Sequence, residues 1–380
     1  MDPIYLDYNA TTPIAPEVAD AMEPFLRGQF GNPTSGHSFG RAAREAVERA
    51  RAQVAALLGC DAQEVLFTSG GTESNNLAII GVVEAHDGER SRVITSAVEH
   101  PAVTRVCRFL AQRGHPITVL PVDETGQVDP LALESTMGPD VLLVTVMHAN
   151  NEVGTLQPVP ELARVAREGG ALVHSDAAQS VGKVSARVDE LGVDLLSVAG
   201  HKLYAPKGIG ALYVREGTPL ARIVHGAGQE RGLRPGTENV LEIVGLGQAC
   251  ELCADKLEAT GEHYRVMRDR LHEALVQAVG ADGVRLNGHP ERRLPNTLSL
   301  CFRGVNADAL LAAVSDQVAA SAGAACHQGG VEISEVLRAM NVPQQWARGT
   351  VRFSVGRETT EAQIDQAVEV VARGLGQVSA

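Results

Sequence analysis

One lysine, Lys202, directly follows a short apolar segment and precedes a turn rich in Gly and Pro. The apolar segment, Asp194–Val198, has the composition of a buried strand, and His201 stands beside the lysine. An amine held at a strand end by a rigid scaffold can form a Schiff base with an aldehyde cofactor. Most lysines are solvated surface charges, so this interpretation depends on the other residues along the chain.

A second segment, from Thr68 to Asn76, is suited to binding phosphate. A strand candidate runs there into Ser-Gly-Gly-Thr and then into a helical pattern. The backbone N–H groups around Gly71 and the hydroxyl of Thr72 could bind phosphate at the start of that helix. The segment is neither a Walker loop nor a G-x-G-x-x-G fingerprint. An ordinary Gly turn with a capping Thr is the alternative.

A third segment places an acid at a strand end. Ala171–His174 has the composition of a buried strand, and Asp176 follows at its carboxyl end, where open α/β sheets bind ligands. A carboxylate there can pair with a protonated pyridine nitrogen, although Asp176 alone is better explained as a helix cap. The phosphate-type turn, the acid and Lys202, in this order, together indicate pyridoxal 5′-phosphate (PLP).

A cysteine and an arginine in the last quarter of the chain could act on a substrate. Cys326 lies among small residues, Ala319–Gly330, with His327 beside it. Such a segment could be a mobile loop that carries a thiolate to a substrate, or Cys326 could be a buried structural residue of an Ala-rich helix. In a strand-like stretch further on, Arg352 could bind a carboxylate, whereas Arg357 is better explained by a surface salt bridge.

These residues need a scaffold, and the pattern of the chain predicts an α/β one. Short β-rich runs alternate with helical patterns, which indicates βαβ units, a mainly parallel sheet and helices on both faces. The strand candidates are Val65–Thr68, Arg92–Ser96, Ile117–Pro121, Val141–Met147, Ala171–His174, Leu195–Val198 and Ala211–Val214. The helix candidates are Arg41–Leu58, Ser74–Ala85, Ala102–Arg113 and Val159–Glu168.

A second, smaller part follows a long helical segment that begins at Val240 and ends near Ala278. This part contains one clear strand candidate and three helical patterns. They are a strand at Thr297–Phe302, helices around Asp308–Leu311 and at Ile333–Met340, and a closing amphipathic helix at Glu361–Gly374. The chain is therefore expected to fold into two domains.

Composition excludes several classes of function. With 44% hydrophobic and 21% charged residues, the 380-residue chain is ordinary for a soluble protein. A net charge of −13 argues against nucleic acid and anionic membranes as partners. We find no secretory signal and no membrane-spanning apolar run, so a cytoplasmic protein is expected. Cys250 and Cys253 form a C-x-x-C in a helical pattern without a second ligand pair, so we expect buried helix cysteines and no metal site.

Taken in order, the motifs of this chain resemble those of the NifS-like cysteine desulfurases, group I of the class-V aminotransferase family, which includes the selenocysteine lyases. The resemblance runs from residue 5 to about residue 366. It implies the PLP-dependent fold type I, with a mainly parallel seven-stranded sheet, helices on both faces and a smaller α+β domain. We expect the large domain to span residues 15–250. Residues 1–14 and 251–380 would form the small domain, with the Cys loop at about 319–332. The matching motifs are Tyr5–Pro13, Gly31–Pro33, Thr68–Asn76, Asn150–Glu152, His174–Gln179, His201–Lys202 and Arg234–Asn239.

The resemblance also implies roles toward the cofactor. Lys202 would hold PLP through a Schiff base, Asp176 would keep its ring nitrogen protonated, and His100 would stack on the ring and shuttle protons. The remaining contacts would be Gln179 and Asn151 at the phenolate side, and Gly71, Thr72, His201 and Thr237 of the partner subunit in a homodimer at the phosphate.

Toward the substrate, the resemblance implies that Arg352 binds the carboxylate of L-cysteine and that the freed Lys202 removes its α-proton. Cys326 would then take the substrate sulfur as a persulfide, leaving L-alanine. A sulfur-acceptor protein, such as an iron–sulfur scaffold or a thio-modification enzyme, would collect it.

Two departures from the usual desulfurase pattern leave the substrate open. The Cys segment, Ala322–His327, lacks the usual Ser-Gly-Ser-Ala-Cys-Thr-Ser, and Ala199 replaces a Ser that bonds the cofactor phosphate in many relatives. Both features resemble the selenocysteine lyases, so L-selenocysteine is the alternative substrate. An aminotransferase, which needs no loop cysteine, and a non-catalytic scaffold are the remaining alternatives.

Overall fold

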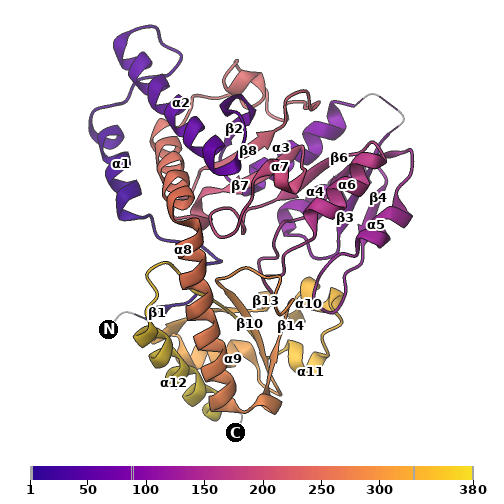
Figure 1. The fold of residues 1–380 in the computed structure, drawn as a ribbon, viewed down its shortest axis with the longest axis vertical. Coiled ribbons are helices and arrows are strands. Elements are labelled where there is room, and N and C mark those ends of the chain that lie inside the picture. The colour runs from indigo at the N-terminus through magenta and orange to yellow at the C-terminus, as the bar shows by residue number, and fades with distance from the viewer. Residues whose placement is uncertain (1–2, 87, 89, 328–329, 379–380) are drawn as a thin grey trace.

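Seven strands form one sheet in the larger part of the molecule, here called the large-sheet part (Figure 1). The computed structural model describes residues 3–86, 88, 90–327 and 330–378, and the side chains of residues 324–332 lie outside this description. In spatial order the strands are β2 (Val65–Thr68), β8 (Gly210–Val214), β7 (Leu195–Ala199), β6 (Leu172–Asp176), β5 (Val141–Thr145), β3 (Arg92–Ser96) and β4 (Ile117–Leu120). Strands β7 to β4 are parallel, and β8 is antiparallel to both neighbours. The predicted mainly parallel sheet is confirmed.

Helices cover both faces of this sheet because alternate strand residues point to opposite sides. In β2, Val65 and Phe67 belong to one apolar core, and Leu66 belongs to another. The core of Leu66 is closed by α3 (Gly71–Glu84) and α4 (Pro101–Gln112). The opposite core is closed by α1 (Pro16–Arg27), α2 (Ser38–Leu58), α5 (Pro130–Thr136), α6 (Val159–Glu168), α7 (Val188–Leu191) and the first half of α8 (Val240–Val279).

An antiparallel sheet of four strands organises the rest of the molecule, the small-sheet part. Its strands, in spatial order, are β12 (Ser321–Ala322), β15 (Thr350–Ser354), β10 (Thr297–Phe302) and β9 (Val284–Leu286). They pack with α9 (Ala307–Val314), α12 (Glu361–Val378) and the second half of α8. Two short helices, α10 (Glu335–Ala339) and α11 (Gln344–Ala347), pack beside β10.

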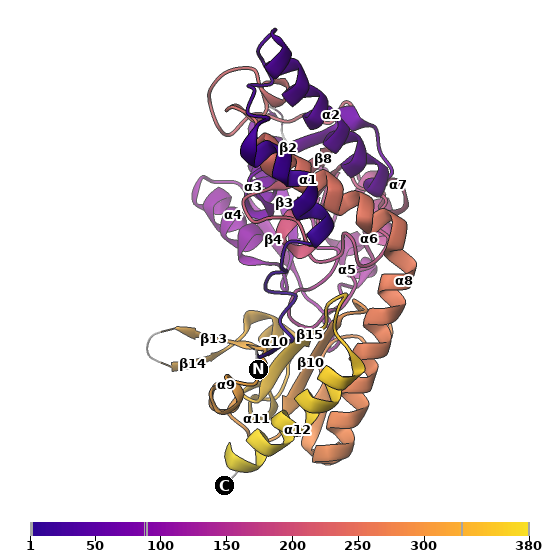
Figure 2. The same cartoon turned by 90° about the vertical axis from the view of Figure 1, so that its left-hand side faces the viewer.

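Two segments connect the parts. Helix α8 spans 40 residues, and it places Leu246 in the core of the large-sheet part and Leu271 in that of the small-sheet part (Figures 1 and 2). The N-terminal segment begins as β1 (Ile4–Tyr5), which pairs with β11 (Val318–Ala319). It then crosses to the large-sheet part, where the backbone N–H of Thr12 donates to the carbonyl of His201. The segment thus passes directly over the end of β7.

The structure differs from the sequence-based expectations mainly around Cys326. We expected a loop there, but the backbone forms a hairpin of β13 (Ala324–His327) and β14 (Gly330–Ile333), which projects from the small-sheet part (Figure 2). The helix expected at Ile333–Met340 begins later, at Glu335. Ile333 is the last residue of β14, and the Ser334 hydroxyl caps α10 by accepting from the backbone N–H of Val336. In the part of the chain that the structure describes, no helix is long and apolar enough to cross a bilayer.

Candidate active site

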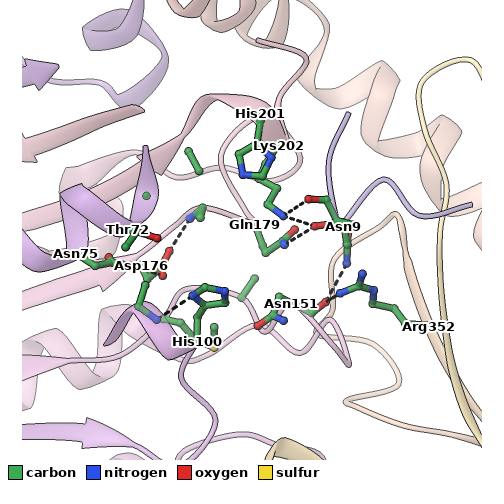
Figure 3. A pocket seen from close by; sticks show the side chains of 17 residues that line it. Asn9, Thr72, Asn75, His100, Asn151, Asp176, Gln179, His201, Lys202 and Arg352 are labelled. Atoms are coloured by element: carbon green, nitrogen blue, oxygen red, sulfur yellow. Dashed lines mark hydrogen bonds between the residues drawn. The ribbon is translucent and has the colours of Figure 1, made fainter. Parts of the chain in front are cut away.

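A cavity of about 300 Å³ lies at the carboxyl ends of β6 and β7, where the two parts of the molecule meet. Ligands of open α/β sheets bind at this edge. Figure 3 shows that its side chains come from separate segments and point inward. Nearly all the site residues predicted from the sequence line it, namely Gly71, Thr72, His100, Asn151, Asp176, Gln179, His201, Lys202 and Arg352.

Lys202 reaches the cavity because the buried strand β7 ends in a tight 3-10 turn, Gly200–Lys202. A Cβ on Gly200 would lie 2.9 Å from the carbonyl oxygen of Ile209, so only glycine fits this turn. The Nζ of Lys202 donates to the carbonyl of Ala10 at 2.7 Å and to that of Asn9. Burial, reinforced by the positive charge of Arg352, lowers the pKa of Lys202 to about 8. A minor but useful share of the amine, roughly a tenth at pH 7, is therefore neutral and nucleophilic.

Asp176 is the last residue of β6, and both its carboxylate oxygens are held in place. Oδ1 accepts from the backbone N–H of Ala178 at 2.9 Å, and Oδ2 accepts from Nδ2 of Asn75 at 2.7 Å. Both donors belong to the large-sheet part, and Asn75 is only 1% exposed. The carboxylate is thereby fixed before any ligand binds, and its remaining lone pairs can accept from a cationic ring nitrogen.

His100 caps helix α4. Its Nδ1 accepts from the backbone N–H of Ala102 at 3.1 Å, which leaves Nε2 for other partners. Desolvation lowers the pKa of His100, although Asp176 opposes this effect, so the ring is mainly neutral near pH 7. The preceding residue, Glu99, has a buried carboxyl that accepts from the Ser96 hydroxyl at 2.6 Å. A neutral ring of fixed orientation can both stack on a planar ligand and exchange a proton.

The start of α3 forms the phosphate-type end of the cavity. Gly70, with a φ of 146°, precedes Gly71 and Thr72, the first residues of the helix, which line the cavity. A Cβ on Gly71 would lie 3.2 Å from the Cβ of Ala199, so the backbone here is closely packed. His201 also lines this end, and burial lowers its pKa to about 4. The backbone N–H groups at the start of α3 and the dipole of this helix favour an anion.

Arg352 projects from β15 into the cavity and is bonded on two sides. Its Nη2 donates to Asp7 at 2.8 Å, and its Nη1 donates to the carbonyl of Asn151 at 2.9 Å. Asp7 lies on the N-terminal segment, and Asn151 lies on the large-sheet part. The guanidinium thus stands where the two parts meet, while its Nε is buried without a partner in the described part of the chain. The predicted surface pair of Arg357 is confirmed, since Arg357 bonds Glu17 at 2.9 Å.

Two predicted site residues are not among the described residues that line this cavity. Thr237 is exposed and lies outside the cavity, although nearby Arg234 bonds Glu73 of α3 at 2.9 Å. The backbone of Cys326 pairs with Val331 in the hairpin, but its side chain lies outside the described residues. The role of each therefore stays a prediction.

The C-x-x-C pair lies in α8, as predicted. Burial raises the pKa of the Cys250 thiol and raises that of the Cys253 thiol to about 11, so both are poor nucleophiles. Among the described residues, no three His, Cys, Asp or Glu side chains are arranged to hold a metal ion.

Comparisons with known proteins agree with this geometry. A family model described as aminotransferase class-V matches residues 4–367. The cysteine desulfurase IscS of Dictyoglomus turgidum is 45% identical over 371 residues, which are 97% of this chain and 94% of that protein. The chain belongs to the class-V aminotransferase family, among its NifS-like cysteine desulfurases.

Solved structures of similar proteins give the same result. One, described as a NifS-like protein, is 36% identical, with a TM-score of 0.93 and coverage of 99% of this chain and 100% of that chain. SspA in complex with cysteine is 35% identical, with a TM-score of 0.82 and coverage of 94% of this chain and 99% of that chain. The class-V fold predicted from the sequence is therefore confirmed.

Three residues with important contacts in this class-V site were missed in the sequence. Asn9 lies in the Tyr5–Pro13 motif, yet its role depends on bonds to distant residues: its Nδ2 donates to Thr297 Oγ1 at 2.8 Å, and its Oδ1 accepts from Asn296. Asp7 and Asn75 likewise stand inside quoted motifs. Their position in those motifs was the only available signal, because their partners are more than 100 residues away.

Proposed function

We propose that this protein is a PLP-dependent cysteine desulfurase that converts L-cysteine to L-alanine. The proposal is carried by one observation: Lys202, Asp176 and Arg352 line the same cavity. They provide an amine of lowered pKa, a fixed carboxylate and a guanidinium. The relatives support the same reaction, since one is a cysteine desulfurase and the similar SspA was solved in complex with cysteine.

The donors and acceptors of the cavity fit PLP. The amine of Lys202 suits its aldehyde, the carboxylate of Asp176 suits a protonated ring nitrogen, and the N–H groups at Gly71 suit its phosphate. Asn75 Oδ1, which is buried without a partner in the described part of the chain, adds a second acceptor beside Asp176. His100, Gln179, Asn151, Thr72 and His201 complete the lining.

When bound, PLP supplies an electron sink that stabilises negative charge at the substrate α-carbon. The protein supplies the positioning and the proton transfers. Arg352 holds the substrate carboxylate, which orients the α-proton toward Lys202. Lys202 accepts that proton because its pKa of about 8 leaves part of the amine neutral. The neutral ring of His100 carries its proton on Nε2, because Nδ1 accepts from Ala102, and can donate this proton near the substrate side chain.

We assign the sulfur transfer to Cys326. Its thiolate attacks the substrate sulfur, so that an S–S bond forms while the C–S bond breaks. The electron pair of the broken bond remains on carbon, and a proton converts that carbon to the methyl group of alanine. The persulfide on Cys326 then passes to an acceptor protein for iron–sulfur cluster assembly or thio-modification.

The test is L-alanine release from L-cysteine and from L-selenocysteine in parallel, with wild type, Cys326→Ala and the control Cys60→Ala. We expect turnover of L-cysteine to collapse in Cys326→Ala and to persist in Cys60→Ala, because Cys60 lies outside the cavity. Full release of L-alanine from L-cysteine by Cys326→Ala would exclude the persulfide step on this residue. Consumption of L-cysteine without L-alanine would favour an aminotransferase-type reaction, which leaves the C–S bond intact.

Selenocysteine lyase is the second candidate, favoured by Ala199. This residue lines the cavity next to Gly71 and offers no hydroxyl to a phosphate. Selenium leaves carbon more readily than sulfur, so Cys326 would then serve mainly to discriminate between substrates. Negligible turnover of L-cysteine with fast turnover of L-selenocysteine would favour this function.

We further propose that the active unit is a homodimer in which Thr237 serves the cavity of the partner subunit. Its exposure, and its place outside its own cavity, support this arrangement. A Thr237→Ala chain mixed with a Lys202→Ala chain tests it. In each mixed dimer, the cavity that keeps Lys202 receives an intact Thr237 from the partner subunit. The mixture should therefore be more active than the mean of the two separate variants.

A further inference from the structure

A buried lysine that the proposed reaction does not use, Lys183, lies directly behind the cavity wall. Its side chain is only 6% exposed. Nζ donates to two oxygens of the same residue, the carbonyl of Gln179 at 2.8 Å and the side-chain Oε1 of Gln179 at 3.4 Å. Gln179 in turn lines the cavity. One side chain, that of Gln179, therefore stands between the lysine and the cavity.

Burying this amine is unfavourable, and its surroundings add to the cost. A buried ammonium loses its hydration, and only good pairing offsets this loss. The charged groups that face Lys183 are Lys202 and Arg352, which are both positive, while the thiol of Cys253 lies on its α8 side. Burial and these charges lower the pKa of Lys183 to about 7. Packing alone would be served better by an apolar side chain.

The contacts of Gln179 define what Lys183 does. A side-chain amide has one acceptor, Oε1, and one donor, Nε2, and these can exchange places by a flip. Here Nε2 donates to the carbonyl of Asn9 at 3.0 Å, and Oε1 accepts from Lys183. A carbonyl can only accept. A lysine amine keeps N–H donors whether it is charged or neutral. The carbonyl of Asn9 and the N–H donors of Lys183 therefore favour the same orientation of the amide.

This orientation determines the chemistry that Gln179 offers to a ligand. Nε2 carries two hydrogens, of which one is used by Asn9, so the amide can present an N–H to the cavity. We propose that Lys183 is a positioning residue that holds Gln179 with this donor available for the ionised ring oxygen of PLP. The inference rests on the proposed function, because it assumes that PLP binds in this cavity.

The experiment follows the visible absorption band of PLP bound through Lys202 as a function of pH. The band changes when the nitrogen that joins PLP to Lys202 loses its proton. When the ionised ring oxygen lacks the N–H donor of Gln179, its negative charge is less stabilised, and the nitrogen keeps its proton to a higher pH. We expect Lys183→Met to raise the pH midpoint by about one unit, the effect of one lost hydrogen bond to a charged oxygen. Lys183→Arg, which keeps the donors, should restore most of the wild-type midpoint.

A double-mutant cycle separates positioning from simple loss of charge. In a Gln179→Leu background, Lys183→Met should move the midpoint by less than half as much, since no amide remains to be oriented. Lys256→Met is the matched control. Lys256 lies on α8, near Lys183, but it is exposed and does not line the cavity. Lys183→Leu, which likewise has no donor, is the second variant to use where Lys183→Met does not fold.

The outcomes are distinguishable. Equal shifts in both backgrounds, or no shift in either, would overturn the positioning role while leaving the proposed function intact. A wild-type chain that forms no band with PLP would instead overturn the proposed function itself.

Discussion

The large-sheet part and the small-sheet part hold their charged cavity residues in different ways. Asp176 is fixed by Asn75 and by the backbone of Ala178, so all three groups belong to one sheet and its helices. Arg352 belongs to the small-sheet part, but it bonds Asp7 of the N-terminal segment and Asn151 of the large-sheet part. The first residue keeps its position within a single core, whereas the second depends on how the two parts meet.

This difference suggests a division of labour. Asp176 and the backbone that carries Lys202 belong to one rigid sheet, although the Nζ of Lys202 also donates to Asn9 and Ala10 of the N-terminal segment. The group proposed to bind the substrate carboxylate stands between the parts. Changes in the large-sheet wall should therefore act mainly on kcat, and changes at Arg352 should act mainly on KM.

The largest effect is expected for Lys202→Ala. The variant loses both the amine that attaches the cofactor and the base that removes the α-proton, so kcat should fall by at least about 10³-fold. Alanine release and the visible band of bound PLP measure the two losses separately. A variant that forms alanine at the wild-type rate would contradict the role of Lys202. It would also contradict the proposal that the proton transfer is carried out by residues of the large-sheet part.

The next effect is expected for Arg352→Gln, which should raise KM for L-cysteine by roughly 10²-fold because a charged pair with the substrate is lost. kcat should change much less. Arg357→Gln is the control: its guanidinium comes from the same part of the chain but bonds Glu17 outside the cavity, so KM should not change. A loss in kcat with unchanged KM would mean that Arg352 acts in the chemical step. It would contradict the proposed division between the large-sheet residues that carry out the reaction and the arginine that binds the substrate.

The same contrast explains what the sequence could predict. Lys202 and Asp176 were predictable because each follows a buried apolar strand, and parallel strands bring their carboxyl ends to one edge. Asp7, Asn9 and Lys183 were not predicted as site residues, since their contacts depend on how the N-terminal segment and the turn after β6 pack in three dimensions. No periodicity marks a residue whose partner is hundreds of positions away, as Asp7 is from Arg352.

The hairpin of Cys326 shows a different limit. Its small residues indicated a loop because they offer few side chains for a core. The backbones of β13 and β14 nevertheless pair, with Ala325 opposite Glu332. Pairing in a two-stranded ribbon relies on backbone hydrogen bonds, which residue type records only weakly.

A smaller effect is expected for Asn75→Ala, which removes one of the two bonds that hold Asp176. kcat should fall by about 10-fold while KM stays close to wild type, because the substrate-binding group is untouched. Asn287→Ala is the matched control: this asparagine is also buried and hydrogen-bonded, but in the small-sheet part. Similar losses of kcat in the two variants would indicate general destabilisation rather than support of Asp176.

The smallest effect on activity, with a distinct effect on stability, is expected for Glu99→Gln. Burial raises the pKa of Glu99 to about 8, even though the Ser96 hydroxyl and the backbone N–H of Met147 favour its ionised form. The folded chain therefore keeps a proton on Glu99 that the unfolded chain releases above its ordinary pKa of about 4.5. The free energy of unfolding contributed by Glu99 should fall as pH rises from about 4.5 to about 8.

Glutamine imitates the protonated carboxyl, since its Oε1 can accept from Met147 and its Nε2 can donate to the Ser96 hydroxyl. The variant should therefore gain stability relative to wild type as pH rises through this window. Denaturant unfolding of both chains at several pH values measures the difference. His148 and His174 also titrate with lowered pKa values, but they are common to both chains and cancel in that difference. Parallel curves would mean that Glu99 is ionised in the folded protein, so that the Ser96 hydroxyl and the backbone N–H of Met147 hold a negative charge and not a neutral carboxyl.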